Sequence, residues 1–276
     1  MDVVHLPFEL WNIIFDHLHL KQQIRFIQIC KIIKNKIFIT DLCNIGKLKI
    51  KLTGDIIKKY PYIKKLYTNR QIGDDDLVLT FGELNLVELN TCCNSKIKKI
   101  NHMTNLRKLS ASGFYCGIGD EDLVGLNLIE LNARNNEKIK KVNHMTNLRK
   151  LNASWFCGIK NESLVPTFGE DCGKLNLIYL NAGYNPEINK INHMTNLRIL
   201  HAEGSFCGID DNSLVGLNLI ELNAWDNPKI SKINHMTNLR KLNASCRCGI
   251  TDDAIVGLNL LELKADDNPK ITKKIG

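Results

Sequence analysis

A repeated double unit constrains the fold of this chain more than any other feature. Residues 127–133 read NLIELNA, and the related string NLRKLNA follows at residues 147–153. Equivalent double units begin at Asn85, Asn176 and Asn218, and half a unit begins at Asn259. Internal repetition of this size is typical of solenoids, in which each unit buries its apolar face against its neighbours. The sequence therefore predicts a stack of short alternating units.

Ten short units over residues 60–276 open with a pair of apolar residues spaced three apart. The pairs are Ile63/Leu66, Leu86/Leu89, Leu106/Leu109, Leu128/Leu131, Leu148/Leu151, Leu177/Leu180, Leu197/Leu200, Leu219/Leu222, Leu239/Leu242 and Leu260/Leu263. The pattern resembles the L-x-x-L-x-L-x-x-N/C motif of leucine-rich repeats, with alanine mostly at the sixth position. The resemblance implies an α/β solenoid, a curved horseshoe with a parallel concave sheet and short helical or 3₁₀ returns.

Two types of unit alternate. The first has asparagine at position nine (Asn94, Asn136, Asn185, Asn227 and Asn268), which we expect to satisfy backbone groups that leave the strand. The second has a cysteine followed by Gly-Ile and an acidic cluster (Cys116, Cys157, Cys207 and Cys248). In this second type, Asp120, Asp211 and Asp252 are predicted to cap short helices. One return is longer than the others because residues 166–174 are inserted.

The first 42 residues do not share the repeat. Pro7 suits a helix start, and apolar residues at positions 10, 13, 14 and 18 follow helical spacing. A segment of this size is too small for a sound core of its own, so its apolar residues should dock on a neighbour or a partner. We predict a helical module at 1–42, a bridging strand or linker at 43–59, and the repeats at 60–276.

The motif of this module resembles the F-box family. Leu6-Pro7-x-Glu9-Leu10, Ile13-Ile14, Leu18 and Ile29-Cys30-Lys31 keep its order and spacing, while Ile33 stands where the family usually has tryptophan. F-boxes bind the Skp-type adaptor of cullin-RING ubiquitin ligases. The resemblance implies that Leu6, Pro7, Leu10, Ile14, Leu18 and Ile24 contact the adaptor. Alternatively, the module serves only as the cap that a solenoid needs at its end.

The whole chain most resembles the F-box/leucine-rich-repeat proteins of giant DNA viruses that infect amoebae, with which it shares Asn-, Lys- and Ile-rich repeats. The resemblance implies a non-catalytic substrate-recognition subunit of a ubiquitin ligase, which holds the adaptor and cullin at one end and a target protein on the concave face. The alternative is an interaction scaffold without a ligase. Neither function needs a cofactor.

Composition excludes several other classes. The net charge of +8 arises largely in recurring Lys-Ile loops such as 96–99 and 138–141, which read as solvated edges rather than a nucleic-acid surface. The chain has no run of about 18 apolar residues, so no membrane span is predicted. The start of the chain does not resemble a secretory signal. The ten cysteines therefore read as reduced thiols, and we expect a cytoplasmic protein, in the host cytoplasm if it is viral.

The repeated cysteines and histidines do not predict a metal or catalytic site. Equivalent residues of one type of unit should lie two strands apart, about 10 Å, which is too far for a disulfide or one zinc ion. The cysteines are better interpreted as small buried residues, and the histidines at 102, 144, 193 and 235 as loop residues. The closer pairs Cys92-Cys93 and Cys246-x-Cys248 leave a metal site as a weaker hypothesis. No catalytic triad, phosphate loop or carboxylate pair is recognisable, so we expect no enzyme.

Positions three, five, seven and eight of each unit should face the concave side or its edge. Position three mostly alternates in charge, which predicts ion pairs between neighbouring strands, and position five is largely asparagine. The irregular residues are the candidates for partner contact, since exposed Trp, Tyr and Arg are enriched in binding hot spots. They are Arg134, Trp155, Tyr179, Tyr184, Ile199, His201, Glu203, Trp225 and Asp226. Alternatively, Trp155 and Trp225 cover the edge of the core.

Overall fold

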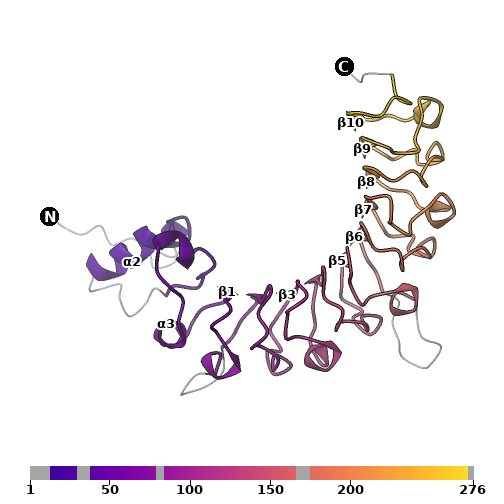
Figure 1. The fold of residues 1–276 in the computed structure, drawn as a ribbon. Coiled ribbons are helices and arrows are strands. Elements are labelled where there is room, and N and C mark those ends of the chain that lie inside the picture. Colours follow the sequence, from indigo (N-terminus) through magenta and orange to yellow (C-terminus); the bar gives the residue numbers. More distant parts are fainter. Residues whose placement is uncertain (1–12, 30–37, 79–83, 166–174, 273–276) are drawn as a thin grey trace.

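The computed structural model describes residues 13–29, 38–78, 84–165 and 175–272, which form a curved solenoid (Figure 1). One short strand per unit lines the inner side of the arc. The strands are β1 (Lys65–Tyr67), β2 (Glu88–Asn90), β3 (Lys108–Ser110), β4 (Glu130–Asn132), β5 (Lys150–Asn152), β6 (Tyr179–Asn181), β7 (Ile199–His201), β8 (Glu221–Asn223), β9 (Lys241–Asn243) and β10 (Glu262–Lys264). Short helices lie on the outer side of the arc.

The strands form one parallel sheet whose order follows the sequence from β1 to β10. Its register places the central leucine of every strand beside that of the next, as with Leu89, Leu109 and Leu131. These leucines and the position-six alanines are buried, except for the partly buried Leu263 and Ala265 of the last unit, because alternate residues of a strand point to opposite faces. The predicted leucine-rich-repeat solenoid with its parallel sheet is therefore confirmed.

The returns contain mainly 3₁₀ helices. They are η2 (Asp74–Asp76), η3 (Asp120–Leu123), η4 (Asn161–Ser163), η5 (Asn212–Leu214) and η6 (Asp253–Ile255). None of the helices in the described ranges has the length and apolar character that crossing a bilayer requires. The inserted residues 166–174 lie outside the described residues.

Asparagines at position nine connect each unit to the one before it. The Nδ2 group of Asn227 donates to the carbonyl oxygens of Ala202 (2.8 Å) and Ile209 (3.1 Å), while its Oδ1 accepts from the amide of Lys229 (3.0 Å). Asn136 repeats this arrangement two double units earlier. Both side chains are buried, so they satisfy backbone groups that water does not reach. The predicted role of these asparagines is confirmed.

The predicted helix-capping role of Asp120, Asp211 and Asp252 is wrong. None of these side chains caps its own 3₁₀ helix; each carboxylate instead accepts from the backbone of the next return. Asp211 accepts from the amides of Ser231 (2.7 Å) and Lys232 (2.8 Å). The next return passes close enough to offer two adjacent amides, which a local capping rule does not consider. These aspartates therefore connect neighbouring units.

We expect Asp211→Ala to lower the free energy of unfolding by about 1–2 kcal/mol at pH 7. Burial opposes ionisation of Asp211, but the amides of Ser231 and Lys232 hold its pKa below the ordinary value. A lowered folded-state pKa stabilises the protein above the unfolded-state pKa, and this contribution is lost as pH falls through the folded-state value. The difference from wild type should therefore shrink below pH ~4 in urea titrations. Glu121→Ala, at an exposed site in an equivalent return, should change the free energy of unfolding by less than about 0.5 kcal/mol.

The described part of the N-terminal module packs on the first units. Residues 13–16 are helical, and α2 spans Leu20–Ile29. Phe15, Ile39 and Leu42 are buried in the same apolar cluster as Ile57 of the following helix. The solenoid core therefore continues into the module, as its small size predicted.

Residues 43–59, predicted as a bridging strand or linker, form helices rather than a strand. This segment contains the 3₁₀ helix η1 (Ile45–Leu48) and the α-helix α3 (Gly54–Lys59). Thr53 caps α3, because its side chain accepts from the amide of Ile56 and Asp55 occupies the first turn. Pairing in this region is limited to an isolated parallel bridge between Asp41 and Lys65, just before the segment.

Candidate functional site

The concave face carries alternating charges that pair across the strands. Glu130 lies 3.0 Å from the Nζ atom of Lys108 and 3.1 Å from that of Lys150, on its two neighbouring strands. Burial would raise the pKa of Glu130, but the two lysines outweigh it and hold that pKa below its ordinary value. A hollow of about 490 Å³ lies over β1 to β7 and includes Tyr67 and Tyr179 in its lining. Most charges on this face are thus neutralised within the sheet.

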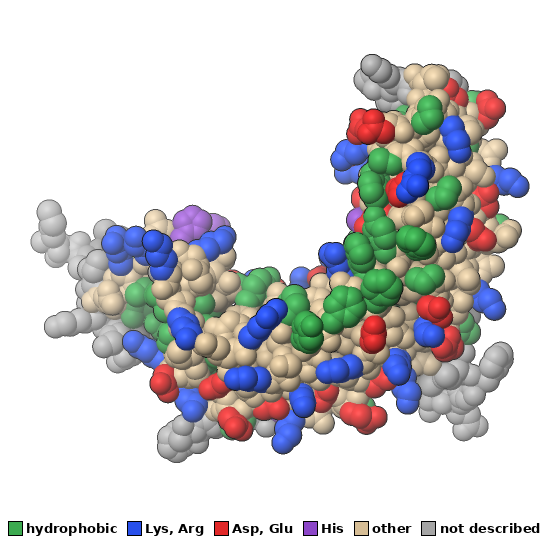
Figure 2. All heavy atoms as spheres, in the orientation of Figure 1, with side chains coloured by type: hydrophobic (Ala, Val, Ile, Leu, Met, Phe, Trp, Pro, Cys, Tyr) green, Lys and Arg blue, Asp and Glu red, His purple; other side chains and the backbone are tan. Residues whose placement is uncertain are grey.

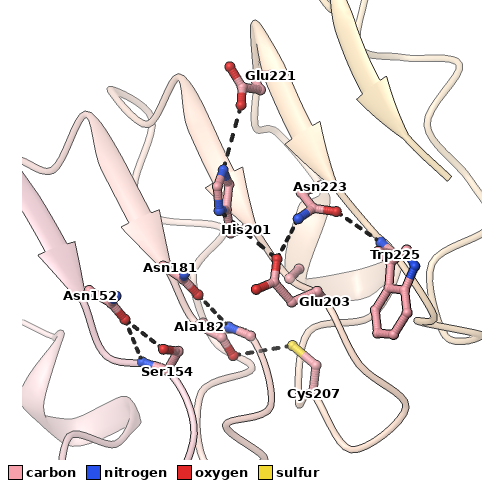
Figure 3. A network of polar contacts seen from close by, with 12 residues as sticks. Asn152, Ser154, Asn181, Ala182, His201, Glu203, Cys207, Glu221, Asn223 and Trp225 are labelled. Carbon is pink, nitrogen blue, oxygen red and sulfur yellow. Dashed lines mark hydrogen bonds and ion pairs between the residues drawn. The ribbon is translucent and has the colours of Figure 1, made fainter. Parts of the chain in front are cut away.

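A polar cluster occupies the middle of the concave face, where the asparagine series is interrupted (Figure 3). His201 of β7 lies between two carboxylates, with Nε2 3.5 Å from Glu221 Oε1 and Nδ1 4.0 Å from Glu203 Oε2. Asn223 donates a hydrogen bond to Glu203. The Tyr179 ring meets the His201 ring edge-on, with centroids 5.3 Å apart. The predicted residues Tyr179, His201 and Glu203 therefore form one contact network, and Ile199 lies beside Tyr179 in the sheet register.

A second group lies where the strands end. Trp155 and Tyr184 stack with ring centroids 4.4 Å apart, and the Arg134 guanidinium lies 5.3 Å from the Trp155 ring. Both aromatic residues have positive φ (63° and 57°). Tyr184 packs so closely on Gly204 that a Cβ there would lie 2.5 Å from Tyr184 Cε1. Arg134, Trp155 and Tyr184 thus form a stack at the edge of the sheet. The amide of Tyr184 joins it to the His201 network by donating to the carbonyl oxygen of Glu203 (2.8 Å).

Trp225 and Asp226 have different surroundings. Trp225 is half-buried and its amide donates to Asn223 Oδ1 (3.1 Å). Asp226 is buried and accepts from Arg247 Nε (2.9 Å) and Nη2 (3.1 Å), which hold its pKa below the ordinary value. The carboxylate of Asp226 is therefore already paired within the chain, with an arginine of the next unit.

Four exposed aromatic residues escaped the sequence reasoning. Phe114, Tyr115, Phe156 and Phe206 lie in the loops that follow β3, β5 and β7, and we call them the aromatic rim. Their exposed fractions are 54%, 71%, 61% and 74%. The available signal was an aromatic residue directly before the repeated cysteine in three units. These four residues occupy positions nine and ten of their units, beyond the positions three, five, seven and eight that are expected to face the concave side or its edge.

The repeated cysteines Cys116, Cys157, Cys207 and Cys248 are buried, which confirms their interpretation as core residues. The Cys207 thiol donates to the carbonyl of Ala182 (3.4 Å; Figure 3). Within the described ranges no three His, Cys, Asp or Glu side chains lie together in a way that could hold a metal ion. The histidines lie in the turns, and His235 Nε2 is 3.2 Å from the carbonyl oxygen of Leu214. Cys92 and Cys93 are adjacent, with their Sγ atoms 3.6 Å apart.

These surroundings predict selective thiol labelling. Burial raises the pKa of Cys157 to about 12 and that of Cys207 to about 11, so neither should form a thiolate at neutral pH. Iodoacetamide should modify the exposed Cys92 in the native protein and spare the four repeated cysteines until denaturant is added. Peptide mass spectrometry with and without urea measures this. Labelling of Cys157 in the native state as fast as that of Cys92 would contradict the buried arrangement.

The structure describes half of the predicted adaptor-binding residues. Leu6, Pro7 and Leu10 lie outside the described residues. Ile14 is 41% exposed, whereas Leu18 is half-buried and Ile24 packs against the core. Of the three described residues, Ile14 thus has the largest exposed fraction available to a partner.

Comparison with known proteins identifies the N-terminal module. The F-box domain family matches residues 4–43. Among solved structures, the chain is similar to the functional domain of InlJ from Listeria monocytogenes, which is described as including a cysteine ladder. That similarity has 20% sequence identity and a TM-score of 0.34, over 76% of this chain and 55% of that one. The chain thus spans just over half the length of that structure.

A search of curated protein sequences found no significant match. The F-box match and the repeated parallel strands are consequently the two findings that classify the molecule. This chain carries an F-box domain in front of a leucine-rich-repeat solenoid.

Proposed function

We propose that this protein is a non-catalytic substrate-recognition subunit of a cullin-RING ubiquitin ligase. The observation that carries the proposal is the F-box match at residues 4–43, directly followed by a solenoid with an open concave face. F-box domains generally bind Skp-type adaptors. The exposed side chain of Ile14, in the helical part of the module, is available for such a contact.

In this proposal the two parts of the chain bind different proteins. The F-box holds the adaptor, and through it the cullin, while the solenoid holds a target protein. Ubiquitin transfer belongs to the partner enzymes, and this chain raises the local concentration of the target near them. Such a subunit needs no catalytic group or cofactor of its own.

We further propose a cytoplasmic location, and the host cytoplasm if the chain is viral. The Asn-, Lys- and Ile-rich repeats that resemble those of amoeba-infecting giant viruses support this. A viral receptor of this kind would direct the host ligase to new targets.

The alternative is an interaction scaffold in which the N-terminal helices only cap the solenoid. The continuous packing of Phe15, Ile39 and Leu42 with the core of the first units favours this reading. It predicts that removal of residues 1–40 exposes apolar surface and causes aggregation, whereas a separable F-box would leave a soluble, folded fragment 41–276.

Reconstitution tests the ligase proposal. Purified full-length chain, a Skp-type adaptor and a cullin amino-terminal domain are mixed and separated by size-exclusion chromatography. We expect one complex that contains all three, which dissociates when the F-box of a known receptor is added in excess. An adaptor–cullin complex that elutes without this chain at micromolar concentrations would refute the proposal and leave the scaffold.

A further inference from the structure

The aromatic rim forms a row along one edge of the solenoid. Phe156 and Phe206 immediately precede the buried cysteines Cys157 and Cys207, and Phe114 lies two residues before the buried Cys116. The units that carry them recur at every second strand. The rings of Phe114 and Phe156 lean together, with centroids 6.2 Å apart. Figure 2 shows hydrophobic side chains gathered along the inner margin of the arc. The repeat thus places exposed rings at regular intervals on one side.

Folding does not require aromatic residues at these positions. In the fourth unit of the same type, the residue before the buried cysteine is Arg247, whose side chain is 77% exposed. The loop closes there as in the other units, and Cys248 is equally buried. The rings at Phe114, Phe156 and Phe206 therefore need an explanation other than the core.

The exposed area is large enough to anchor a partner. An aromatic side chain has roughly 200 Å² of surface, so four rings at these exposures offer on the order of 500 Å². A standard protein interface buries about 800 Å² on each partner. Exposed apolar patches of this size mark interaction sites in soluble proteins. The rim could thus supply more than half of one side of such an interface.

Charges beside the rim indicate what the partner carries. The Arg134 guanidinium lies over Trp155, and within the described ranges it has no carboxylate at ion-pair distance. Lys138 Nζ donates to the carbonyl oxygen of Cys116 (2.7 Å), which places a second positive charge beside the rim. This lysine also has no acidic partner in the described part of the chain. Aromatic residues and arginine are the types enriched in binding hot spots. A partner that covers the rings should therefore bring an acidic group.

We infer that the aromatic rim, with Arg134, binds a protein segment in which apolar side chains lie next to an aspartate or glutamate. The apolar side chains cover Phe114, Phe156 and Phe206, and the carboxylate pairs with Arg134. The inference rests on the proposed function in one respect: that function makes the bound segment part of a ligase target.

Single-stranded nucleic acid fits the rim less well. Base stacking requires free ring faces along a continuous basic groove. The aromatic residues beside the rim do not extend it with free faces, because Trp155 has Arg134 on its ring and Tyr184 stacked on it, and Tyr184 also packs on Gly204.

A displayed library of random 16-residue peptides, selected on the full-length chain without adaptor, tests the inference. We expect enriched peptides to contain at least two apolar residues and an acidic one. Phe156→Ser and Phe206→Ser should each raise their Kd tenfold or more, and Arg134→Ser should weaken mainly the acidic peptides. Because the three side chains are exposed in separate units, thermal midpoints should change little.

The matched controls are Val124→Ser and Val215→Ser. Val124 and Val215 are the C-cap residues of the 3₁₀ helices η3 and η5 on the outer side, and they are 57% and 60% exposed. They should leave the peptide Kd within twofold of wild type. The inference is overturned if no peptide is enriched, if enriched peptides bind the phenylalanine variants as tightly as wild type, or if a uridine dodecamer binds the rim and the peptides do not. Adaptor binding is measured separately, so either proposal can fail alone.

Discussion

Asn227→Leu should lower the free energy of unfolding by about 3–6 kcal/mol. The substitution keeps the branched shape and the number of heavy atoms but removes three hydrogen bonds, two donated to the carbonyls of Ala202 and Ile209 and one accepted from the amide of Lys229. The site is fully buried, so water cannot replace them. Each buried polar group that loses its partner costs about 1–3 kcal/mol.

Urea denaturation followed by far-UV circular dichroism measures this loss. Asn238→Leu is the matched control, because Asn238 is exposed in the turn that precedes Leu239. It should change the free energy of unfolding by less than about 0.5 kcal/mol. A loss below about 1 kcal/mol for Asn227→Leu would show that the asparagine series is not the connection between units described above.

Ile14→Asp should weaken adaptor binding at least 100-fold, about 3 kcal/mol. An aspartate in an apolar interface must either lose its hydration or protonate, and both are costly. Because Ile14 is 41% exposed in the free chain, the variant should keep its fold and thermal midpoint. Loss of binding would therefore report on the interface rather than on stability.

Isothermal titration calorimetry with a purified Skp-type adaptor gives both affinities. Ile129→Asp is the matched control: Ile129 has the same exposure, 41%, but lies beside β4 in the solenoid. It should leave the adaptor affinity unchanged. Equal affinity of the Ile14→Asp variant and wild type would argue against the F-box contact and favour the cap.

The regular part of the fold was predictable from the sequence, because it follows from repetition. The central leucines, the position-nine asparagines and the pairing of Glu130 with Lys108 and Lys150 each depend on a residue and its equivalent one unit away. The repeat period determines which residues of adjacent units become neighbours, so these contacts can be predicted without a structure. The burial of the repeated cysteines followed for the same reason.

Features that depend on the path of a loop were not predictable. Capping rules are local and place Asp211 on its own helix, whereas its partners lie in the following return. The pairing of Asp226 with Arg247, one unit later, likewise depends on the path of a loop. The exposure of Phe156 and Phe206 likewise depends on how the chain turns after the strand.

The sequential order of the sheet has a consequence for how this chain reaches its fold. Every strand pairs only with its neighbours in sequence, so each pairing closes a loop of one unit. The most widely spaced pair, β5 and β6, joins Lys150 to Tyr179. Loop-closure entropy grows only with the logarithm of length, so this connection costs about 0.3 kcal/mol more than one between units of ordinary length. Folding that starts in any group of units can therefore spread in both directions, and the inserted residues hardly slow its passage through the middle of the arc.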